Sequence, residues 1–467
     1  MKITFHGAAR TVTGSKHMLQ LTNGNKYLLD CGMFQGMGDE TLQLNSHFGF
    51  RSDEVTAVVI SHAHIDHIGL LPKLVKEGYR GNIYCTPPTK ELAEILLLDS
   101  AHIQESDAIH VNKRNKAQNK PLIEPLYTQD DVQNVLPLFV TIPYNEPYRI
   151  DDNIELTYTD CGHILGSAAI NLKIDENGKH ATLTFSGDVG RYHDMILRPP
   201  STFPQADYLL LESTYGNKLH KLVVNSADEV LKFITDTCLK KKGKLIIPAF
   251  SVGRTQEILY LLNRLDSERR LPPLNYFVDS PLSIEATEII KHNPECFNKE
   301  AQKLLHTDPD LFGFPGLHYT RSAEESKALN DDHTPCVIIA ASGMAEAGRI
   351  KHHIAQNISN RDNTILLVGY CEPRSLGGRL RDGATEVSIY GDKYTVNAEI
   401  GMIESMSAHG DYEDLLDWVS CQDASKVKRV FLVHGEYDVQ VAFRERLLHK
   451  GFAEIDIPHQ HEQVDLD

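Results

Sequence analysis

Apolar, β-branched runs along this chain repeatedly end in a polar residue close to a glycine. The run from Val55 to Ile60 leads into His-Ala-His-Ile-Asp-His at 62–67, and the following segment, IGLLPKLVKEG, has helical periodicity and stops at a glycine. Four further runs, YLLDCG, LTYTDCGHILGS, TLTFSGD and KRVFLVHGE, lead in the same way to Asp30, His163, Asp188 and His434. The pattern predicts strands that deliver polar side chains onto the loops at their ends.

The pattern changes from about residue 216, where strand-like and helix-like segments alternate. KLIIPAF, NYFVDS, CVIIAA and ILLVG are apolar runs, and VGRTQEILYLLNRL, IEATEIIKH and AEAGRIKHHI have helical periodicity. This alternation predicts a doubly wound parallel sheet. Because His434 has to join residues 62–188, the middle block is predicted to be an insertion. The expected domains are 1–215 and 396–467, which fold together, and an inserted domain at 216–395.

The residues at these strand ends have the chemistry of a metal site. Neutral imidazole and carboxylate are the usual ligands of zinc and its first-row neighbours. The loop at 62–67 supplies several ligands but cannot close a site alone, so further ligands are expected from the other strand ends. Each of these residues by itself is more typical of a turn or cap, and it is the set that predicts the metal site.

Composition restricts where such a site can work. With 467 residues, the chain is long enough for two domains. We find neither an apolar N-terminal signal nor an apolar run of membrane-spanning length, which predicts a cytoplasmic protein without a membrane partner. The eight cysteines form no C-x-x-C pair and are expected to be reduced thiols. The net charge of −17 is unfavourable for binding nucleic acid, so any such binding is expected to be salt-sensitive and confined to a cleft.

With these residues in place, the chain resembles the metallo-β-lactamase superfamily and, within it, the β-CASP nucleases. That branch includes the endonuclease subunit of the eukaryotic pre-mRNA cleavage and polyadenylation factor and its bacterial and archaeal relatives. The superfamily motifs match Asp30, His62, His64, Asp66, His67, His163 and Asp188. The β-CASP motifs match Glu212 in LLLESTYG, His409 in SAHGD and His434 in LVHGE. One departure is the stretch RSLGGR at 374–379, where relatives carry Gly-Thr-Leu-Gly-Arg.

The resemblance implies an αββα sandwich with the inserted β-CASP sheet, and two Zn²⁺ ions per chain, with Mn²⁺ as an alternative. It assigns His62, His64 and His163 to the first metal, Asp66, His67 and His434 to the second, and Asp188 to both. It also implies catalytic roles for Asp66 and for Asp30, which is expected to orient ligands or water. His409 is the expected general acid, with Glu212 holding its ring.

Substrate contacts are expected mainly from the inserted block. Ser342 and Gly343 stand before an expected helix start and are predicted to cradle a phosphate, with Arg349 and Arg254 as nearby basic residues in the sequence. Arg379 lies in a stretch interpreted as a glycine-rich loop. A second insert, at about 101–147, is helical and polar and contains His102, Gln104, Glu105 and His110. We interpret it as a helical hairpin that covers the sandwich edge, with an approach to the site as the alternative.

These observations favour a two-zinc ribonuclease that cleaves single-stranded RNA internally, with 5′ exonuclease activity as an open addition. Another hydrolase of the same fold, acting on DNA or on a small phosphodiester or ester, is the main alternative. Glu212 and His409 argue against a thioesterase, and the intact ligand set argues against a non-catalytic scaffold. A flavodiiron-like oxidoreductase is disfavoured because the chain has no separate flavin domain. The sequence leaves the choice between monomer and homodimer open.

Overall fold

A computed structural model describes residues 1–467 except 177, 221–225, 370, 372 and 404–405. The described residues form two compact units, each with its own sheets. The first unit comprises Met1–Tyr192, Pro199–Leu219 and His409–Asp467, and the second comprises His193–Arg198 and His220–Ala408. The second unit thus interrupts the first. Its carboxyl-terminal limit differs from the expected boundary at residue 395 because the strand Glu399–Ile403 pairs in parallel with Thr364–Val368 of the second unit.

The first unit is built on two sheets. One has the strand order β22-β1-β2-β3-β4-β5-β6 and the other the order β21-β20-β11-β10-β9-β8-β7. The strands of the first sheet are β22 (Glu462–Asp465), β1 (Lys2–Gly7), β2 (Lys16–Gln20), β3 (Lys26–Leu29), β4 (Ala57–Val59), β5 (Ile83–Cys85) and β6 (Phe139–Thr141). Those of the second are β21 (Ile455–Asp456), β20 (Arg429–Val433), β11 (Tyr208–Glu212), β10 (Lys179–Phe185), β9 (Ala168–Glu176), β8 (Ile154–Asp160) and β7 (Tyr148–Arg149).

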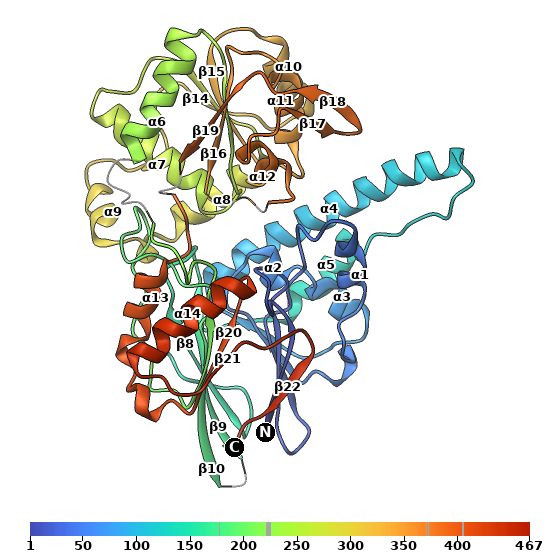
Figure 1. Cartoon of the computed structure of the whole chain (residues 1–467), viewed down its shortest axis with the longest axis vertical. Helices are drawn as coiled ribbons and strands as arrows, with labels where there is room; N and C mark the ends of the chain where they lie inside the picture. Colours follow the sequence, from blue (N-terminus) through green and yellow to red (C-terminus); the bar gives the residue numbers. More distant parts are fainter. Residues whose placement is uncertain (177, 221–225, 370, 372, 404–405) are drawn as a thin grey trace. The chain divides into compact units, whose positions relative to one another are not determined.

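The core of this unit lies between the two sheets. Phe5 and Leu29 from the first sheet join Leu172, Phe185 and Phe431 from the second in one buried cluster. A second cluster packs Leu415, Trp418 and Phe443 of the carboxyl-terminal helices against the outer face of the second sheet. The helices of this unit are α1 (Thr41–Ser46), α2 (Ile65–Ile68), α3 (Leu71–Lys76), α4 (Pro87–Ala117), α5 (Gln129–Val135), α13 (Tyr412–Trp418) and α14 (Tyr437–Lys450). With α3, α4 and α5 outside the first sheet (Figure 1), the layers follow the expected αββα order.

The second unit contains a parallel sheet with the order β14-β13-β15-β12-β16-β19. Figure 1 shows helices on both of its faces, so the predicted doubly wound arrangement is confirmed. Its strands are β14 (Leu317–Tyr319), β13 (Asn275–Val278), β15 (Cys336–Ala340), β12 (Leu245–Pro248), β16 (Thr364–Val368) and β19 (Glu399–Ile403), beside a hairpin of β17 (Glu386–Ile389) and β18 (Asp392–Thr395). Its helices are α6 (Ser226–Ile234), α7 (Arg254–Ser267), α8 (Pro281–His292), α9 (Lys299–Leu304), α10 (Ala323–Asp331), α11 (Arg349–Asn357) and α12 (Leu376–Arg381).

The insert at 101–147 forms the carboxyl-terminal part of α4, a return segment and α5, but its end is strand β6, which pairs with β5 at the edge of the first sheet and is therefore not part of a hairpin. Gln104 accepts a hydrogen bond from the amide of Leu126, and Glu105 accepts one from the side chain of Gln129 at 2.8 Å, so both residues hold the return segment and α5 against α4. His102 and His110 are exposed. The predicted helical hairpin over the sandwich edge is therefore present where α4 packs against α5. Beyond that contact, α4 continues past the sandwich edge (Figure 1).

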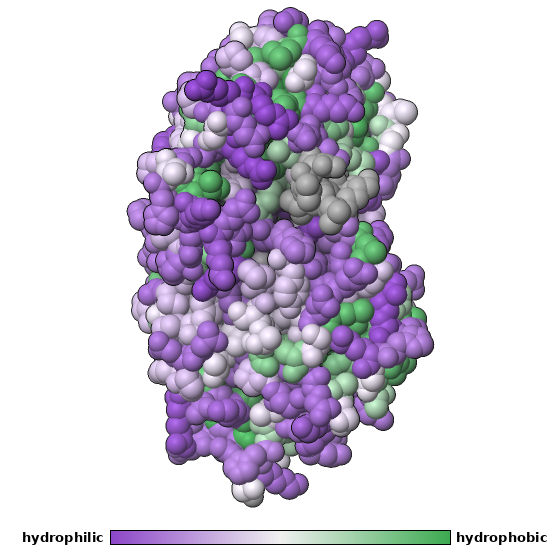
Figure 2. All heavy atoms as spheres, turned by 90° about the vertical axis from the view of Figure 1, so that its left-hand side faces the viewer, coloured by the Kyte–Doolittle hydropathy of each residue, from purple (hydrophilic) through white to green (hydrophobic). Residues whose placement is uncertain are grey.

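One face of the molecule can be described by its hydropathy. On the face drawn in Figure 2, hydrophilic side chains predominate and apolar ones form small, separate patches. Within the described residues, no helix combines the length and apolar character needed to cross a bilayer.

Candidate metal centre

Strand direction brings the predicted site residues to one edge of the sandwich. β3 and β4 run in parallel in the first sheet, as do β10, β11 and β20 in the second. Parallel strands present their carboxyl ends at the same edge, which is where loops gather side chains from distant parts of a sequence. Asp30 follows β3 directly, Glu212 is the last residue of β11, and His434 follows β20.

The first group of metal-ligand type consists of His62, His64, His163 and Asp188, whose ligand atoms all lie within 4.8 Å of one another. Nδ1 of His64 is 3.2 Å from Nε2 of His62 and 3.2 Å from Nε2 of His163. Oδ2 of Asp188 is 3.5 Å from Nε2 of His62. Three imidazole nitrogens and a carboxylate oxygen therefore point at one small volume.

The second group consists of Asp66, His67 and His434, and it satisfies the same 4.8 Å limit. Oδ2 of Asp66 is 3.3 Å from Nε2 of His434. Asp188 lies between the two groups, because its Oδ2 is also 3.4 Å from Nε2 of His67. The structure therefore brings together all the residues predicted as metal ligands, with Asp188 in the central position.

The donor atoms fit a divalent metal. Nε2 of His67 and Oδ1 of Asp188 are buried and have no hydrogen-bond partner among the described residues, which is costly unless a cation accepts their lone pairs. Burial lowers the pKa of His64 to about 4, so its imidazole is neutral at pH 7, the form that binds metal. A set of imidazoles and carboxylates at this spacing is suited to zinc or a related first-row ion.

Asp30 faces the site from behind the ligands. Its Oδ2 is 2.6 Å from Nδ1 of His67 and accepts hydrogen bonds from the hydroxyls of Ser61 and Ser15 at 2.9 and 3.1 Å. Its Oδ1 accepts from the amide of Ser61 at 2.8 Å. A carboxylate that binds Nδ1 fixes the ring of His67 and directs Nε2 toward the metal. Asp30 and His434 both have left-handed backbones, with φ of 59° and 49°, a strained conformation that is frequent at functional sites.

Some supporting residues had no clear signal in the sequence. Ser15 and Ser61 bind Asp30, and the hydroxyl of Thr214 lies 3.1 Å from Nδ1 of His434. Each stands beside a motif residue or within a family-like stretch, which is the only hint that the sequence offers. Hydroxyl residues are common in loops, so their role becomes visible only when the loops are placed together.

His409 and Glu212 form a pair beside the two groups. Nδ1 of His409 is 3.3 Å from Oε1 of Glu212 and 3.9 Å from Oδ2 of Asp188. Glu212 is buried and fixed, since its Oε1 accepts from the amide of Val189 at 2.7 Å and its Oε2 from the amide of Thr214 at 3.2 Å. Burial acts to lower the pKa of His409, but the charges of Glu212 and Asp188 outweigh burial and raise the pKa to about 9. This imidazole is thus a cation at neutral pH and can donate a proton.

Comparisons with known proteins match this arrangement along the chain. A metallo-beta-lactamase superfamily domain matches residues 18–203, a Beta-Casp domain 255–380, and a Zn-dependent metallo-hydrolase RNA specificity domain 393–458. The chain is 36% identical to ribonuclease TTHA0252 of Thermus thermophilus over 451 residues, which cover 97% of each protein. The chain belongs to the β-CASP family.

More distant β-CASP relatives are larger proteins. Transcription termination factor FttA of Cenarchaeum symbiosum is 33% identical over 91% of this chain, which spans 64% of that factor. FttA of Methanothermobacter thermautotrophicus is 31% identical over 93% of this chain and 67% of its own length. The chain therefore corresponds to about two thirds of these factors and to nearly the full length of the Thermus protein.

Two of the residues predicted to bind substrate, Arg254 and Arg349, are engaged by other residues of the second unit. Arg254 is buried and forms an ion pair with Glu257. Arg349 donates to Oδ1 of Asp279 at 2.5 Å and to the carbonyl of Arg321 at 2.7 Å. Both guanidinium groups therefore have protein partners that hold the unit together.

The loops expected around these arginines also differ from the prediction. Ser342 and Gly343 do not directly precede a helix, because α11 begins at Arg349. The amide of Ser342 donates to the carbonyl of Ala347 at 3.2 Å, which closes a loop between β15 and α11.

The stretch interpreted as a glycine-rich loop is helix α12, and Arg379 is exposed on it. The hydroxyl of Ser375 caps this helix by accepting from the amide of Gly378 at 3.0 Å. Gly377 is buried, and a Cβ there would lie 2.9 Å from Sγ of Cys371. The glycines therefore serve close packing of a helix, a role that the sequence pattern alone does not separate from that of a loop.

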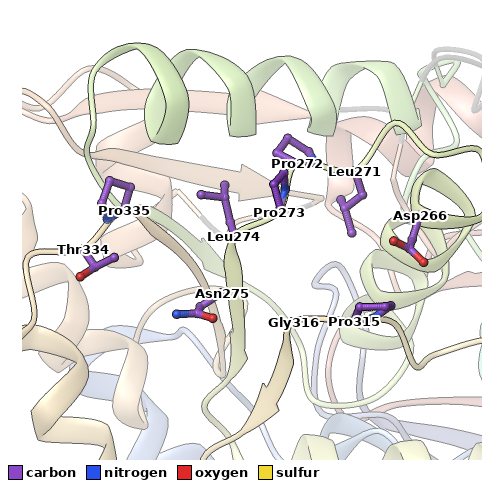
Figure 3. Close-up of a pocket in the computed structure, with 10 residues that line it drawn as sticks. All are labelled: Asp266, Leu271, Pro272, Pro273, Leu274, Asn275, Pro315, Gly316, Thr334 and Pro335. Atoms are coloured by element: carbon purple, nitrogen blue, oxygen red, sulfur yellow. The ribbon is translucent and has the colours of Figure 1, made fainter.

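A hollow in the β-CASP unit lies at the other end of its sheet. It is lined by Leu274 and Asn275 at the start of β13, by Gly316 before β14 and by Pro335 before β15 (Figure 3). Because these strands are parallel, this is the amino-terminal edge, opposite to the loop that contains Ser342. The hollow is therefore separate from the predicted substrate residues.

Proposed function

We propose that this chain is a metal-dependent ribonuclease that hydrolyses phosphodiester bonds of RNA with two zinc ions. The observation that carries the proposal is the position of the His409–Glu212 pair next to two groups of metal-ligand residues that share Asp188. The first ion would be held by His62, His64 and His163 and the second by Asp66, His67 and His434. The similarity to a protein named ribonuclease supports RNA as the substrate.

The two groups of metal-ligand residues have a different task from the pair of His409 and Glu212. Bound there, divalent cations supply Lewis acidity, which activates water and stabilises negative charge on a phosphate. Asp30 orients His67, and Asp66 is directed at His434. Manganese is the alternative ion, because imidazole and carboxylate ligands bind it as well. It ranks second to zinc because these donors bind it more weakly.

His409 acts on the leaving group. An alkoxide leaves RNA only with difficulty, and a positioned acid that protonates it contributes about 10² to 10⁴ in rate. The carboxylate of Glu212 keeps His409 protonated and fixes its ring, so that Nε2 is the atom that can donate the proton. This pair favours a phosphodiesterase over a thioesterase, whose leaving thiolate needs less protonation.

We further propose single-stranded RNA as the substrate, cut internally, with 5′ exonuclease activity as a second mode. Arg379, Ser342 and Gly343 remain candidates for phosphate contacts. The residues of both metal groups come from a single chain, so a homodimer would double the site without completing it. A cytoplasmic location fits the eight free thiols, most of them buried.

The test is hydrolysis of matched RNA and DNA strands, a thioester and a nitrophenyl phosphodiester, before and after metal removal. We expect RNA cleavage, loss of activity after prolonged chelation, and recovery when about two equivalents of zinc are added per chain. His64→Ala and Asp66→Asn should lose both metal and activity on every substrate. Comparing 5′-labelled with 3′-labelled RNA separates internal cleavage from digestion at one end.

Each part of the proposal can fail separately. Full activity with a single metal per chain would remove the two-ion scheme. Equal cleavage of DNA would remove the preference for RNA, and thioester hydrolysis without phosphodiester cleavage would overturn the nuclease assignment.

A further inference from the structure

Helix α4 leaves the body of the first unit. Its buried residues, among them Leu92, Leu97 and Ala101, are concentrated in its amino-terminal half, and Ala108 is the last of them. Beyond Ala108 the helix continues to Ala117 and projects past its neighbours, and the chain then returns toward α5 (Figure 1). We call residues 108–123 the arm tip.

The arm tip has one face that is closed by the return segment. The side chain of Asn112 donates to the carbonyl of Ile123 and accepts from its amide, both at 2.8 Å. The side chain of Asn115 donates to the carbonyl of Pro121 at 2.8 Å. Because Asn112 and Asn115 are three residues apart, they lie on the same side of the helix. The arm tip is therefore an ordered hairpin with its asparagine face turned inward.

The other face of the arm tip is cationic. At about 100° per residue, His110, Lys113 and Arg114 lie opposite Asn112 and Asn115. Lys116, four residues after Asn112, lies at the edge of the asparagine face next to Lys113, and Lys120 follows in the turn. All four Lys and Arg side chains are exposed, and no carboxylate of the described residues forms an ion pair with them. The nearest acidic residues along the chain are Asp107 and Glu124, which are exposed at the two ends of the arm tip.

This local charge contrasts with the net charge of −17 for the chain. From Ala101 to Ala117 the helix extends about 24 Å, at about 1.5 Å per residue. Charges farther apart than about 8 Å are largely screened at physiological ionic strength. Most of the acidic body therefore does little to neutralise the arm tip, where the four Lys and Arg charges outnumber the two carboxylates of Asp107 and Glu124 beside it.

The opposite end of α4 is attached to the candidate metal centre. The hydroxyls of Thr86 and Thr89 donate to the carbonyl of Gly166 at 2.6 and 2.9 Å, in the loop that contains His163. The helix is 31 residues long, so the arm tip lies about 45 Å from this loop along the helix axis. That length corresponds to roughly 13 nucleotides of stacked strand at about 3.4 Å each.

We propose that the arm tip is a docking surface for the phosphate backbone of an RNA strand whose other part occupies the metal centre. This inference rests on the proposed ribonuclease function and adds a contact outside the reaction site. Cations spaced about 5–6 Å apart along a helix suit a row of phosphates. A protein partner is less well matched, since the exposed Leu122 and Ile123 lie on the return segment and only Ile109 borders the cationic face.

The test compares two variants that each lose four positive charges. The arm variant is Lys113→Gln, Arg114→Gln, Lys116→Gln and Lys120→Gln. The control variant is Lys173→Gln, Lys179→Gln, Lys426→Gln and Lys450→Gln, all at exposed positions of the same unit. Binding of labelled RNA of about 30 nucleotides is measured with zinc-loaded protein in the slowly cleaving His409→Ala background at several salt concentrations. Cleavage of RNA of about 6 nucleotides and hydrolysis of a nitrophenyl phosphodiester are measured with zinc in the two variants without the His409 change.

For the long RNA, we expect the arm variant to bind at least about 10-fold more weakly at low salt, with a salt slope reduced by about 0.7 for each lost phosphate contact. The control variant should bind as the parent does. Cleavage of the short RNA and hydrolysis of the small diester should be unchanged in both variants, because neither substrate reaches the arm tip while it occupies the metal centre.

A parental salt slope for the arm variant on long RNA would overturn the docking surface, as would a loss of short-RNA cleavage as large as the loss of long-RNA binding. Unchanged RNA binding together with a changed oligomeric state would assign the arm tip to a protein contact instead. If the parent binds long RNA through the arm tip but does not cleave it, the ribonuclease proposal fails while the docking surface stands.

Discussion

At the scale of single residues, the pair of His409 and Glu212 offers the sharpest test of the chemistry. His409→Ala should retain both metals and slow RNA cleavage by about 10² to 10⁴, because only protonation of the leaving oxygen is removed. On a nitrophenyl phosphodiester, whose leaving group departs without a proton, the defect should be much smaller. Metal content by elemental analysis is the control. Equal defects on the two substrates would show that His409 is not the general acid.

The same pair predicts a pH dependence. The pKa of His409 is raised to about 9 by Glu212 and Asp188 against the effect of burial, so its acid form is present at neutral pH and is lost as pH rises through that value. Cleavage should therefore fall on the alkaline side, at or below about pH 9, because bound metal cations also lower this pKa. Glu212→Gln removes the nearest negative charge and should move the alkaline limb to lower pH. An unmoved limb in the pH profile of kcat would contradict the assigned pairing.

At the scale of elements, close packing of loops fixes the metal ligands. A Cβ on Gly32 would lie 1.6 Å from the carbonyl oxygen of Asp66 and 2.8 Å from the amide of His67. Gly32→Ala should therefore displace the loop that carries both residues and weaken metal binding by about 10-fold or more. In the control Gly313→Ala, the nearest atom is the end of the Asp310 side chain, which forms an ion pair with Lys291, so this change disturbs a surface contact of the second unit and no metal ligand. Metal titration that gives equal affinities for the two variants would argue against this account.

At the scale of the whole molecule, the division into units predicts which activity survives a deletion. Every residue of the two metal groups, with Glu212 and His409, belongs to the first unit. The ends of the inserted segment are close together, because the carbonyl of Lys218 accepts from the amide of Tyr412 at 3.3 Å. Replacing residues 220–408 with a short glycine-rich linker should leave a folded unit that binds metal and hydrolyses a nitrophenyl phosphodiester.

We expect this shortened chain to cleave long RNA more slowly than the parent, since the candidate phosphate contacts Arg379, Ser342 and Gly343 are removed. Circular dichroism and metal content establish that the remaining unit is folded. RNA cleavage at the parental rate would show that the second unit contributes no substrate contact.

The sequence alone determined the elements and the chemical type of the centre. Strand periodicity followed by a polar residue is a local signal, and it pointed to Asp30, His62, His163, Asp188 and His434 as residues at strand ends. Alternating strands and helices likewise predicted the parallel sheet of the second unit. These features depend on the residues nearest in sequence, so a single chain is sufficient to read them.

Only the tertiary structure decided which side chains from distant segments contact one another. Asp30 binds Ser15, Ser61 and His67 because parallel strands end at one edge, and no local pattern records that meeting. Arg254 and Arg349 are engaged within the second unit, and the glycines before Arg379 lie in a helix that needs close packing. The arm tip became visible because burial of α4 ends at Ala108, while its helical pattern continues. Burial and partner choice depend on residues far away in the sequence, and only the folded chain places them.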